Sequence, residues 1–400
     1  MSLGVLGRLL DDSYEKSVRE SLVPLTLTRL VANTGYRFAP PFIAIIAGAE
    51  QGFGVSIARV GLIISISELA GFLAPLLGTF VDRVSRRTAM ASGLGGSFLG
   101  IVMMAFAPNL TVLCIGLTLL NLLKSCFDLG MAAWIADRVP YERRGRVVGL
   151  TETSWALSLL IGVSLLGLVT AVSTWRVACM VGGVFIAACA LWLDSRIRAA
   201  GGVTRSQRHA ESPPGRMTLR AWLVPLSMFG MMGAAQCLFV TFGAWLADDF
   251  SFGASGIAAV GFALGVGELV SSTSSARLTD RIGKERSVVL GAAVMVPSAA
   301  VLAAFDTSLV VGLAGLAIFI IGFEYGVVSM LPLATDLVES APGKGFGLVI
   351  GAGTFGRGVL TFVATVLYES IGISGAALAG IVCAVLSAAA IYAFSRGRSW

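Results

Sequence analysis

Residues 308–336 read SLVVGLAGLAIFIIGFEYGVVSMLPLATD, in which Glu324 is the only charged side chain before the closing Asp336. A helix needs roughly 20 mostly apolar residues to cross a bilayer. The remaining chain has the same character, because 56% of its 400 residues are hydrophobic and only 13% are charged. The composition therefore predicts an all-α membrane protein that crosses the bilayer many times.

Further stretches of similar length and apolarity bring the prediction to 12 transmembrane helices. Pro40 and Pro41 are expected to kink the first of them, as prolines do in membrane spans. No predicted connection is long enough to form a separate soluble domain. The predicted spans are 21–48, 56–80, 88–107, 110–136, 146–172, 175–193, 221–246, 255–276, 287–304, 308–336, 345–368 and 372–395.

The basic residues orient these spans. If both termini are cytoplasmic, 23 of the 29 Lys and Arg residues lie on the cytoplasmic side and only Arg176 lies on the other, while five fall within spans. This bias follows the positive-inside rule. We therefore expect an integral protein of the cytoplasmic (plasma) membrane with both termini cytoplasmic. The bias also explains the net charge of +6 without a nucleic-acid partner.

The chain repeats itself at about 200 residues. Val60-Gly61 returns as Val260-Gly261, and Glu68-Leu69 returns as Glu268-Leu269. Two parallel six-helix halves joined by a basic linker are a known transporter plan, with the pathway between the halves. The repeat predicts two pseudo-symmetric six-helix halves with a short lead, linker and tail, namely 1–20, 21–193, 194–220, 221–395 and 396–400.

The connection after span 56–80 carries the most specific motif. Residues 78–87 read GTFVDRVSRR and resemble the G-x-x-x-D-R-x-G-R-R signature of the major facilitator superfamily, with Ser85 in place of glycine. A weaker copy contains Asp280, Arg281 and Gly283. Residues 124–132, KSCFDLGMA, are similar to the family's R-x-x-Q-G-x-G-A-A motif. The chain is thus identified as resembling this superfamily, in particular its drug–proton antiporter-like branch.

The resemblance implies a conformational gate at the cytoplasmic edge. Small residues allow close helix approach, and carboxylates suit helix N-termini. The family pattern implies that Asp82 meets the helix start at 345–347 and that Asp280 meets the start at 145–149. The arginines could instead serve only as positive-inside anchors. The predicted gate residues are Gly78, Asp82, Arg83, Arg86, Arg87, Asp280 and Arg281.

Ionisable residues inside spans are costly and are functional candidates. The resemblance implies that spans 88–107, 175–193, 287–304 and 372–395 pack outside the transport cavity, and no charge falls in their interiors. The charges lie in the other spans, which the family pattern places around the cavity. They are Arg37, Glu68, Lys124, Asp128, Glu268, Glu324 and Arg357, with Arg29 and Glu152 nearer the cytoplasm.

The predicted proton-coupling residues are Glu68, Asp128, Lys124 and Arg37. Lys124 and Asp128 are four residues apart and can pair within one helix. Burial raises the pKa of a carboxyl group and a nearby cation lowers it, so a carboxyl beside a cation can exchange a proton near neutral pH. The alternative is that Lys124–Asp128 and Arg37–Glu68 are permanent structural pairs.

The predicted substrate cavity is lined from both halves. Arg29, Asn33 and Arg37 share one helix face, with Tyr36 beside them. Glu268 either binds a cationic substrate or is protonated, and the sequence does not distinguish between these two alternatives. The predicted cavity residues are Asn33, Tyr36, Gln236, Glu268, Glu324, Tyr325 and Arg357.

The preferred function is proton-coupled efflux of small amphipathic molecules by alternating access. The helix at 158–167 lacks the proline that drug antiporters of the family often show there, which weakens this choice. Proton-coupled uptake of a small organic solute is the alternative, and a non-transporting membrane receptor or assembly factor is a remote one. We expect no enzyme activity, catalytic residue, cofactor or metal. The expected partners are a small-molecule substrate, protons and the lipid bilayer, and the protein is expected to act as a monomer.

Overall fold

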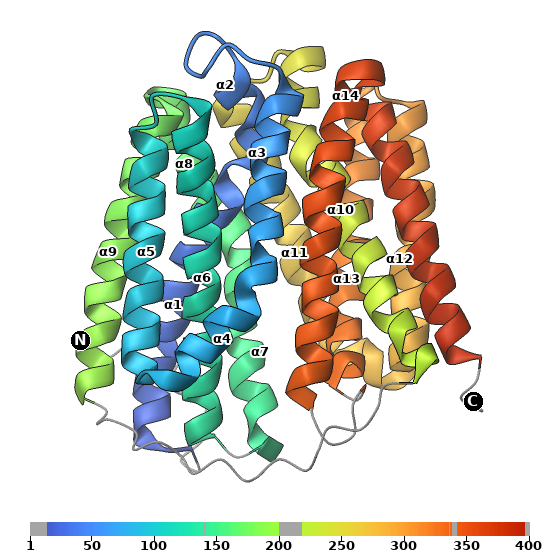
Figure 1. Ribbon diagram of the computed structural model, residues 1–400. Helices are drawn as coiled ribbons and strands as arrows, with labels where there is room; N and C mark the ends of the chain where they lie inside the picture. The colour runs from blue at the N-terminus through green and yellow to red at the C-terminus, as the bar shows by residue number, and fades with distance from the viewer. Residues whose placement is uncertain (1–13, 140, 200–217, 336, 338–341, 397–400) are drawn as a thin grey trace. The chain divides into compact units, whose positions relative to one another are not determined.

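The computed structural model describes residues 14–139, 141–199, 218–335, 337 and 342–396, and every regular element in these ranges is helical (Figure 1). Most of the predicted lead, linker and tail lie outside the described residues. So do Asp336 and the side chains of Asp82, Asp280 and residues 141–146. The helical fold that the apolar runs predict is confirmed for the described chain.

The chain divides into two compact units. Unit 1 comprises residues 1–38 and 73–207, and unit 2 comprises residues 39–72 and 208–400. Residues 39–72 precede the linker in sequence but belong to unit 2, and the two six-helix halves stay a prediction. The predicted spans 21–48 and 56–80 are therefore each divided between the units.

Unit 1 is a bundle of long helices with one π-helical segment. Helices α5 and α6 pack closely together, and α1 packs against α6, α7 and α9. Ser85 begins α5 as its N-cap, because its side chain accepts a hydrogen bond from the Thr88 amide. The elements are α1 (Lys16–Phe38), α4 (Ala74–Arg83), α5 (Arg86–Ala105), α6 (Leu110–Arg138), α7 (Tyr141–Leu157), the π-helix η4 (Ser158–Val163), α8 (Ser164–Val172) and α9 (Trp175–Ala199).

Unit 2 centres on α10, which packs along α14 and is largely buried. Helix α14 contains two arms that meet at Ile371 and Gly372, where the backbone is not helical, and Figure 1 shows the chain reversing direction there. The elements are η2 (Pro40–Phe42), α2 (Ile43–Ala47), α3 (Ile57–Leu69), η3 (Ala70–Leu73, whose last residue belongs to unit 1), η5 (Leu219–Trp222), α10 (Leu223–Phe250), α11 (Ala254–Ile282), α12 (Lys284–Ala304), α13 (Leu309–Thr335) and α14 (Pro342–Ser395).

Nine helices among the described residues are long and apolar enough to cross a membrane. The predicted spans 21–48 and 56–80 are not among them. Helix α1 has 23 residues but contains many polar and charged side chains, and η3 divides the second span into the short helices α3 and α4. The kink expected at Pro40 and Pro41 is confirmed, since α1 ends at Phe38 and η2 follows. Both arms of α14 fall within one of the nine. An integral membrane protein is thus indicated, and the number of 12 stays a prediction.

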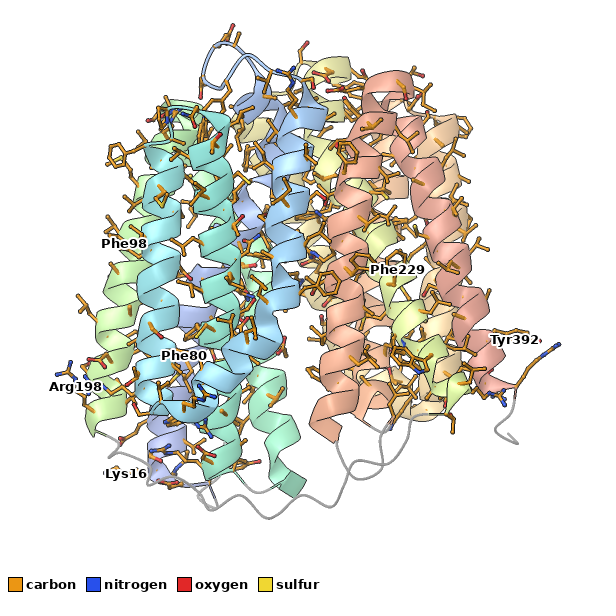
Figure 2. The ribbon with its side chains drawn as sticks, in the orientation of Figure 1. Lys16, Phe80, Phe98, Arg198, Phe229 and Tyr392 are labelled. Atoms are coloured by element: carbon orange, nitrogen blue, oxygen red, sulfur yellow. The ribbon has the colours of Figure 1, made fainter. Side chains whose placement is uncertain are left out.

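The surface of the helices suits a lipid environment. Large apolar side chains are exposed along the outside of unit 1, and Phe98 on α5 points outward in Figure 2. Figure 2 also shows Lys16 and Arg198 at the same end of unit 1. These residues begin α1 and close α9, so the charged ends of two antiparallel helices gather on the side that the basic residues predict as cytoplasmic.

Candidate functional site

A polar face of α1 turns into the interior of unit 1. Arg29, Asn33 and Arg37 recur every four residues, and all three are buried. The Asn33 side-chain nitrogen donates a hydrogen bond to the Ser154 hydroxyl on α7 over 3.3 Å. The face predicted from the spacing of these residues is therefore confirmed, and its neighbours come from α6 and α7.

Two cations and two carboxylates form an ion network on three helices. Arg29 Nε lies 3.3 Å from Asp128 Oδ1, and its Nη1 lies 2.8 Å from Glu152 Oε1. Lys124 Nζ lies 2.8 Å from Asp128 Oδ2, as the four-residue spacing predicts. Asp128 thus bridges α1 and α6, and we refer to Arg29, Lys124, Asp128 and Glu152 as the ion network.

The network is not sealed from its surroundings. The Asp128 side chain is 25% exposed and that of Glu152 is 44% exposed, whereas Arg29 and Lys124 are largely buried. An ionised carboxylate that faces lipid within an apolar span costs much free energy. The exposed edge of the network therefore favours a polar, water-accessible environment on this side of unit 1.

Aromatic rings enclose the cations beside the network. The Arg37 guanidinium donates to the Trp155 carbonyl over 2.8 Å, and its central carbon lies 4.5 Å from the Trp155 ring centroid. Lys124 Nζ lies 5.0 Å from the Tyr36 ring centroid. Cations placed over aromatic faces are stabilised by the ring quadrupole. We refer to Tyr36, Arg37, Lys124 and Trp155 as the cation–aromatic cluster.

Sequence reasoning missed part of this site. It named Arg29 and Glu152 only as charges nearer the cytoplasm and did not include Trp155 among the predicted site residues. The signal that was available is the spacing on α7, where Thr151, Ser154 and Trp155 lie on the side that meets α1. Both Arg29 and Arg37 donate hydrogen bonds to carbonyl oxygens of that helix.

The helix that carries Trp155 ends at Leu157 and continues as a π-helix from Ser158. Residues Ser158–Val163 are π-helical, and Gly162 within them packs on Thr34 of α1. A Cβ atom at Gly162 would lie 1.8 Å from the Thr34 hydroxyl oxygen. Such π segments are frequent at functional sites. The absence of a side chain at Gly162 thus allows α1 to approach this segment closely.

In unit 2, Glu68 on α3 pairs with Arg357 on α14. Arg357 Nη2 lies 3.1 Å from Glu68 Oε1, and the two side chains are only 11% and 3% exposed. Both residues were predicted as site residues, but Arg37 was considered as the partner of Glu68. The reason is that Glu68 and Arg357 are 289 residues apart, so no local spacing reports their contact.

The other predicted cavity residues of unit 2 lie in polar contacts between helices. Gln236 on α10 donates to Thr361 on α14 over 3.0 Å. Glu324 accepts a hydrogen bond from Ser272 on α11 over 2.5 Å, and Glu268 is buried. The Tyr325 hydroxyl instead donates to Ser287 on α12 over 3.1 Å. Tyr325 therefore faces a helix that was expected to pack outside the cavity.

Two of the three arginines of the 78–87 motif, Arg86 and Arg87, connect helices of unit 1 at one end. Arg86 Nε lies 2.9 Å from Asp137 Oδ2 on α6, and Arg87 Nε lies 2.5 Å from Asp194 Oδ1 on α9. Arg198 also pairs with Asp194. Arg86 and Arg87 thus make specific ion pairs beyond the general positive-inside bias.

The expected close approach at Gly78 is not seen among the described residues. A Cβ atom built there meets nothing within 4 Å, so a side chain would find open space. Arg83 and Arg281 are exposed. The side chains of Asp82 and Asp280 lie outside the described residues, so the predicted gate contacts at 345–347 and 145–149 stay predictions.

Long apolar helices with charged residues buried among them define a polytopic membrane protein with a polar interior, the general plan of a transporter. The family model described as Major Facilitator Superfamily matches residues 25–365. The chain belongs to the major facilitator superfamily, and the resemblance carried by the 78–87 motif is confirmed.

Relatives cover the chain to different extents. An uncharacterized MFS-type transporter of Bacillus subtilis (strain 168), YwfA, is 28% identical over 305 residues, which is 74% of this chain and 73% of that protein. A Lactococcus lactis protein described as a multi-drug resistance efflux pump PmrA homolog is 36% identical over 123 residues, 30% of each chain.

A solved structure matches nearly the whole chain. The bacterial homolog of the human lysosomal transporter Spinster, in its inward-facing and unoccupied conformation, superposes with a TM-score of 0.73 at 14% identity. The match covers 96% of this chain and 98% of that chain. At this identity the likeness shows the fold alone.

Proposed function

We propose that this protein is a secondary active transporter that exports small amphipathic molecules in exchange for protons. The observation that carries the proposal is the ion network, in which a carboxylate bridges two cations inside apolar spans. Protonation of such a carboxylate removes the charge that holds both cations. The energy of a proton gradient is thereby converted into a change of contacts between helices, as alternating access requires.

The two predicted proton-coupling carboxylates differ in their surroundings. Asp128 has a partly exposed side chain and two cationic partners. Glu68 has a buried side chain and pairs with Arg357. We propose that both exchange protons, Asp128 from the exposed edge of the network and Glu68 only when its contact with α14 separates.

The cation–aromatic cluster supports an amphipathic substrate. Trp155 and Tyr36 offer apolar ring surface, and Arg37 and Lys124 lie against these rings. We propose that Asn33, Tyr36, Gln236, Glu268, Glu324 and Arg357 contribute to substrate binding. The similarity to a multi-drug efflux pump homolog over part of the chain favours efflux.

Uptake is the second candidate. Cations set against aromatic rings also suit an anionic aromatic solute, and such a solute could be carried inward together with protons. The missing proline in residues 158–167 favours this candidate over a drug antiporter. The two differ in the direction of proton movement relative to the compound.

We further propose a monomer in the cytoplasmic membrane with both termini cytoplasmic. The clustering of Lys16 and Arg198 at one end of unit 1 supports this orientation. Motif residues Asp82, Arg83, Asp280 and Arg281 are proposed to contribute to a cytoplasmic gate, while Arg86 and Arg87 stabilise the bundle beside it.

The test is compound-driven proton movement in proteoliposomes that contain a pH-sensitive dye. A panel of cationic, neutral and anionic amphipathic compounds is added under an imposed pH gradient, with protein-free liposomes as the control. Efflux-type exchange predicts that protons and compound move in opposite directions. Movement in the same direction supports uptake, and compound movement without protons contradicts proton coupling.

A further inference from the structure

Helix α11 carries a polar stripe inside unit 2. Residues 270–279 read VSSTSSARLT, so hydroxyl side chains are concentrated between the middle of α11 and the end that the basic residues predict as cytoplasmic. The members of the stripe recur every three or four residues and therefore share one face of the helix. At 1.5 Å per residue the stripe is about 16 Å long. Its members are Glu268, Ser272, Ser275 and Thr279.

The stripe faces α13, because its hydroxyl groups form hydrogen bonds with side chains of that helix. Ser272 Oγ donates to Glu324 Oε1 over 2.5 Å. One turn farther along α11, Ser275 Oγ lies 3.0 Å from Ser329 Oγ, and Thr279 Oγ1 lies 2.7 Å from the same oxygen. These five side chains follow one another from the middle of unit 2 toward one end, and we refer to them as the hydroxyl column.

Three hydroxyl groups of the column are mutually connected. Ser275 Oγ lies 3.1 Å from Thr279 Oγ1, so each of the oxygens of Ser275, Thr279 and Ser329 is within hydrogen-bond distance of the other two. A hydroxyl group is both a donor and an acceptor, and its hydrogen rotates to suit its neighbours. The three groups therefore have more than one pattern of hydrogen bonds. This property allows a proton to enter at one oxygen and another to leave from the next.

The hydroxyl column is shielded from bulk water. Glu324 is 5% exposed, Ser275 and Ser329 are 1% exposed, and Thr279 is 6% exposed. A wide aqueous channel does not fit these values. A proton that moves along the column is therefore carried by the side chains themselves and by single ordered water molecules.

The helices around Glu324 carry charges of both signs. Among the described residues of the helices packed against α13, the charged side chains away from the helix ends are Glu268 on α11 and Arg357 on α14. Helices α10 and α12 contribute no carboxyl or basic side chain between their ends. A change in the charge of Glu324 therefore changes its interaction with groups of opposite sign on two helices, so the arrival of a proton there has consequences for the packing of unit 2.

We propose that the hydroxyl column is a proton path, along which Glu324 exchanges its proton with the end of unit 2 that the basic residues predict as cytoplasmic. The inference rests on the proposed transport function and adds a route by which protons leave or enter. Ser272 donates to Glu324 when the carboxyl group is ionised and accepts from it when the group is protonated. The same hydrogen bond thus serves both states.

The transfer conserves protons at every oxygen. The O–H bond of the Glu324 carboxylic acid breaks and its proton binds Ser272 Oγ, while the proton that Ser272 held moves on. Ser272 and Ser275 are one helical turn apart, with about 5–6 Å between their Cβ atoms, and one water molecule bridges them in this path. Each hydroxyl group gains one proton and gives up one. Beyond Thr279 the proton binds solvent water, and Glu324 is left as a carboxylate.

Hydroxyl groups between membrane helices also serve simply to hold the helices together. Ser271 has this role on the same helix, because its hydroxyl donates to the Ile321 carbonyl over 2.7 Å and the side chain is 3% exposed. A carbonyl oxygen has no proton to pass on, so the contact of Ser271 ends there. Ser271 therefore provides a matched control that joins the same two helices without belonging to the column.

The test is the rate at which Glu324 changes its protonation state after a pH jump. The full-length protein in lipid nanodiscs is followed by the infrared C=O absorption of the carboxylic acid, and Glu324→Gln identifies the band. Thr279→Val removes a hydroxyl group at nearly constant volume and is expected to slow the change about tenfold or more. Thr279→Ser keeps the hydroxyl group and is expected to retain the wild-type rate. Equal rates in Thr279→Val and the wild type, or no pH-dependent band from Glu324, would overturn the proposal.

Two further variants separate a proton path from a structural contact. Ser329→Ala is expected to slow the change as Thr279→Val does, because both interrupt the column. Ser271→Ala removes a contact between the same helices and is expected to leave the rate unchanged. Thermal unfolding of each variant shows whether the fold is retained. Equal slowing in Ser271→Ala and Ser329→Ala would mean that a looser contact between α11 and α13 explains the effect, and would contradict the path.

The midpoint pH of the Glu324 band gives an independent check. Thr279 lies at the far end of the column from Glu324, so Thr279→Val is expected to change the rate and to leave the midpoint at its wild-type value. A shifted midpoint with an unchanged rate would show that the hydroxyl group acts on the charge of Glu324 and does not carry its proton.

The infrared measurement needs no transported compound, so its failure differs from a failure of the proposed function. An unchanged rate in Thr279→Val together with compound-driven proton movement would reject the path and retain the transporter. A slowed rate in a protein without compound-driven proton movement would retain the path and reject proton-coupled efflux.

Discussion

Charged side chains within the membrane spans are stabilised differently in the two units, by the ion network in unit 1 and by the Glu68–Arg357 pair in unit 2. In the network, Asp128 pairs with both Arg29 and Lys124, and its side chain is partly exposed. In unit 2, one carboxylate meets one guanidinium in a buried contact between α3 and α14. A shared network can exchange partners in steps, whereas a sealed pair is either made or broken. We infer that Asp128 can exchange a proton from the exposed edge of the network, whereas Glu68 exchanges one only when its contact with α14 separates.

The largest expected effect separates a carboxylate that bridges buried cations from one that bridges exposed cations. Asp128 bridges Lys124 and Arg29 inside the spans, and Asp194 bridges Arg87 and Arg198 at the end of unit 1. Asp128→Asn is expected to destabilise the protein by about 3–5 kcal/mol, because the largely buried Lys124 loses this carboxylate and Arg29 retains only its pair with Glu152. Asp194→Asn should cost about 0–1 kcal/mol, since its arginines reach water. Thermal unfolding in detergent measures the stability of both variants. Equal losses of stability would contradict the expected difference between the two ion bridges.

A second prediction tests whether Glu68 and Arg357 act as a unit. Glu68→Gln and Arg357→Gln each leave one buried charge, whereas the double variant leaves none. The two effects on stability should therefore be non-additive, with a coupling energy of about 0.5–3 kcal/mol. The same cycle on Glu369 and Arg357 serves as the control, because Glu369 contacts Ala58 at the exposed end of the contact between α3 and α14. If the losses of stability for Glu68 and Arg357 are additive, the ion pair has no coupling energy and the prediction is contradicted.

A third prediction concerns the π segment beside the cation–aromatic cluster. Gly162→Val would drive a side chain into Thr34 and is expected to destabilise by about 1–3 kcal/mol. Gly149 on α7 has open space around it, so Gly149→Ala is expected to be neutral or to stabilise by up to about 1 kcal/mol. The thermal shifts of the two variants should have different signs or clearly different sizes. A neutral Gly162→Val would show that the close approach of α1 is dispensable.

The smallest expected effect tests the placement of Tyr325. Its hydroxyl donates to Ser287 rather than to a group near Glu324. Tyr325→Phe should therefore cost about 0.5–1.5 kcal/mol of stability and leave compound transport unchanged. Ser287→Ala should have a similar effect. If Tyr325→Phe loses transport without losing stability, Tyr325 contributes to the substrate cavity, as the sequence analysis predicts.

Much of the fold follows from composition and periodicity. Apolar runs predict helices because a chain in lipid must satisfy its backbone hydrogen bonds internally. The four-residue spacing of Arg29, Asn33 and Arg37 predicts their common face, and the spacing of Lys124 and Asp128 predicts their ion pair. Each of these features is local, so a single stretch of sequence contains the signal.

The remaining features depend on contacts that no local spacing reports. The partner of Glu68 lies 289 residues away, and the assignment of residues 39–72 to unit 2 depends on packing of α3 along α14. The repeat relates Glu68 to Glu268, although the sequence analysis predicted proton coupling for Glu68 and substrate binding or protonation for Glu268. Glu68 pairs with Arg357 on α14, and the repeat by itself does not report this contact.

The most direct test of the account is proton movement per transported compound in proteoliposomes of Glu68→Gln and of its matched control, Glu50→Gln, which makes the same chemical change at an exposed position. The measurement uses the same compound and the same imposed pH gradient for both proteins and the wild type. The account predicts that Glu50→Gln retains compound-driven proton movement and that Glu68→Gln loses it while still exchanging labelled for unlabelled compound. Undiminished proton movement in Glu68→Gln would contradict the account.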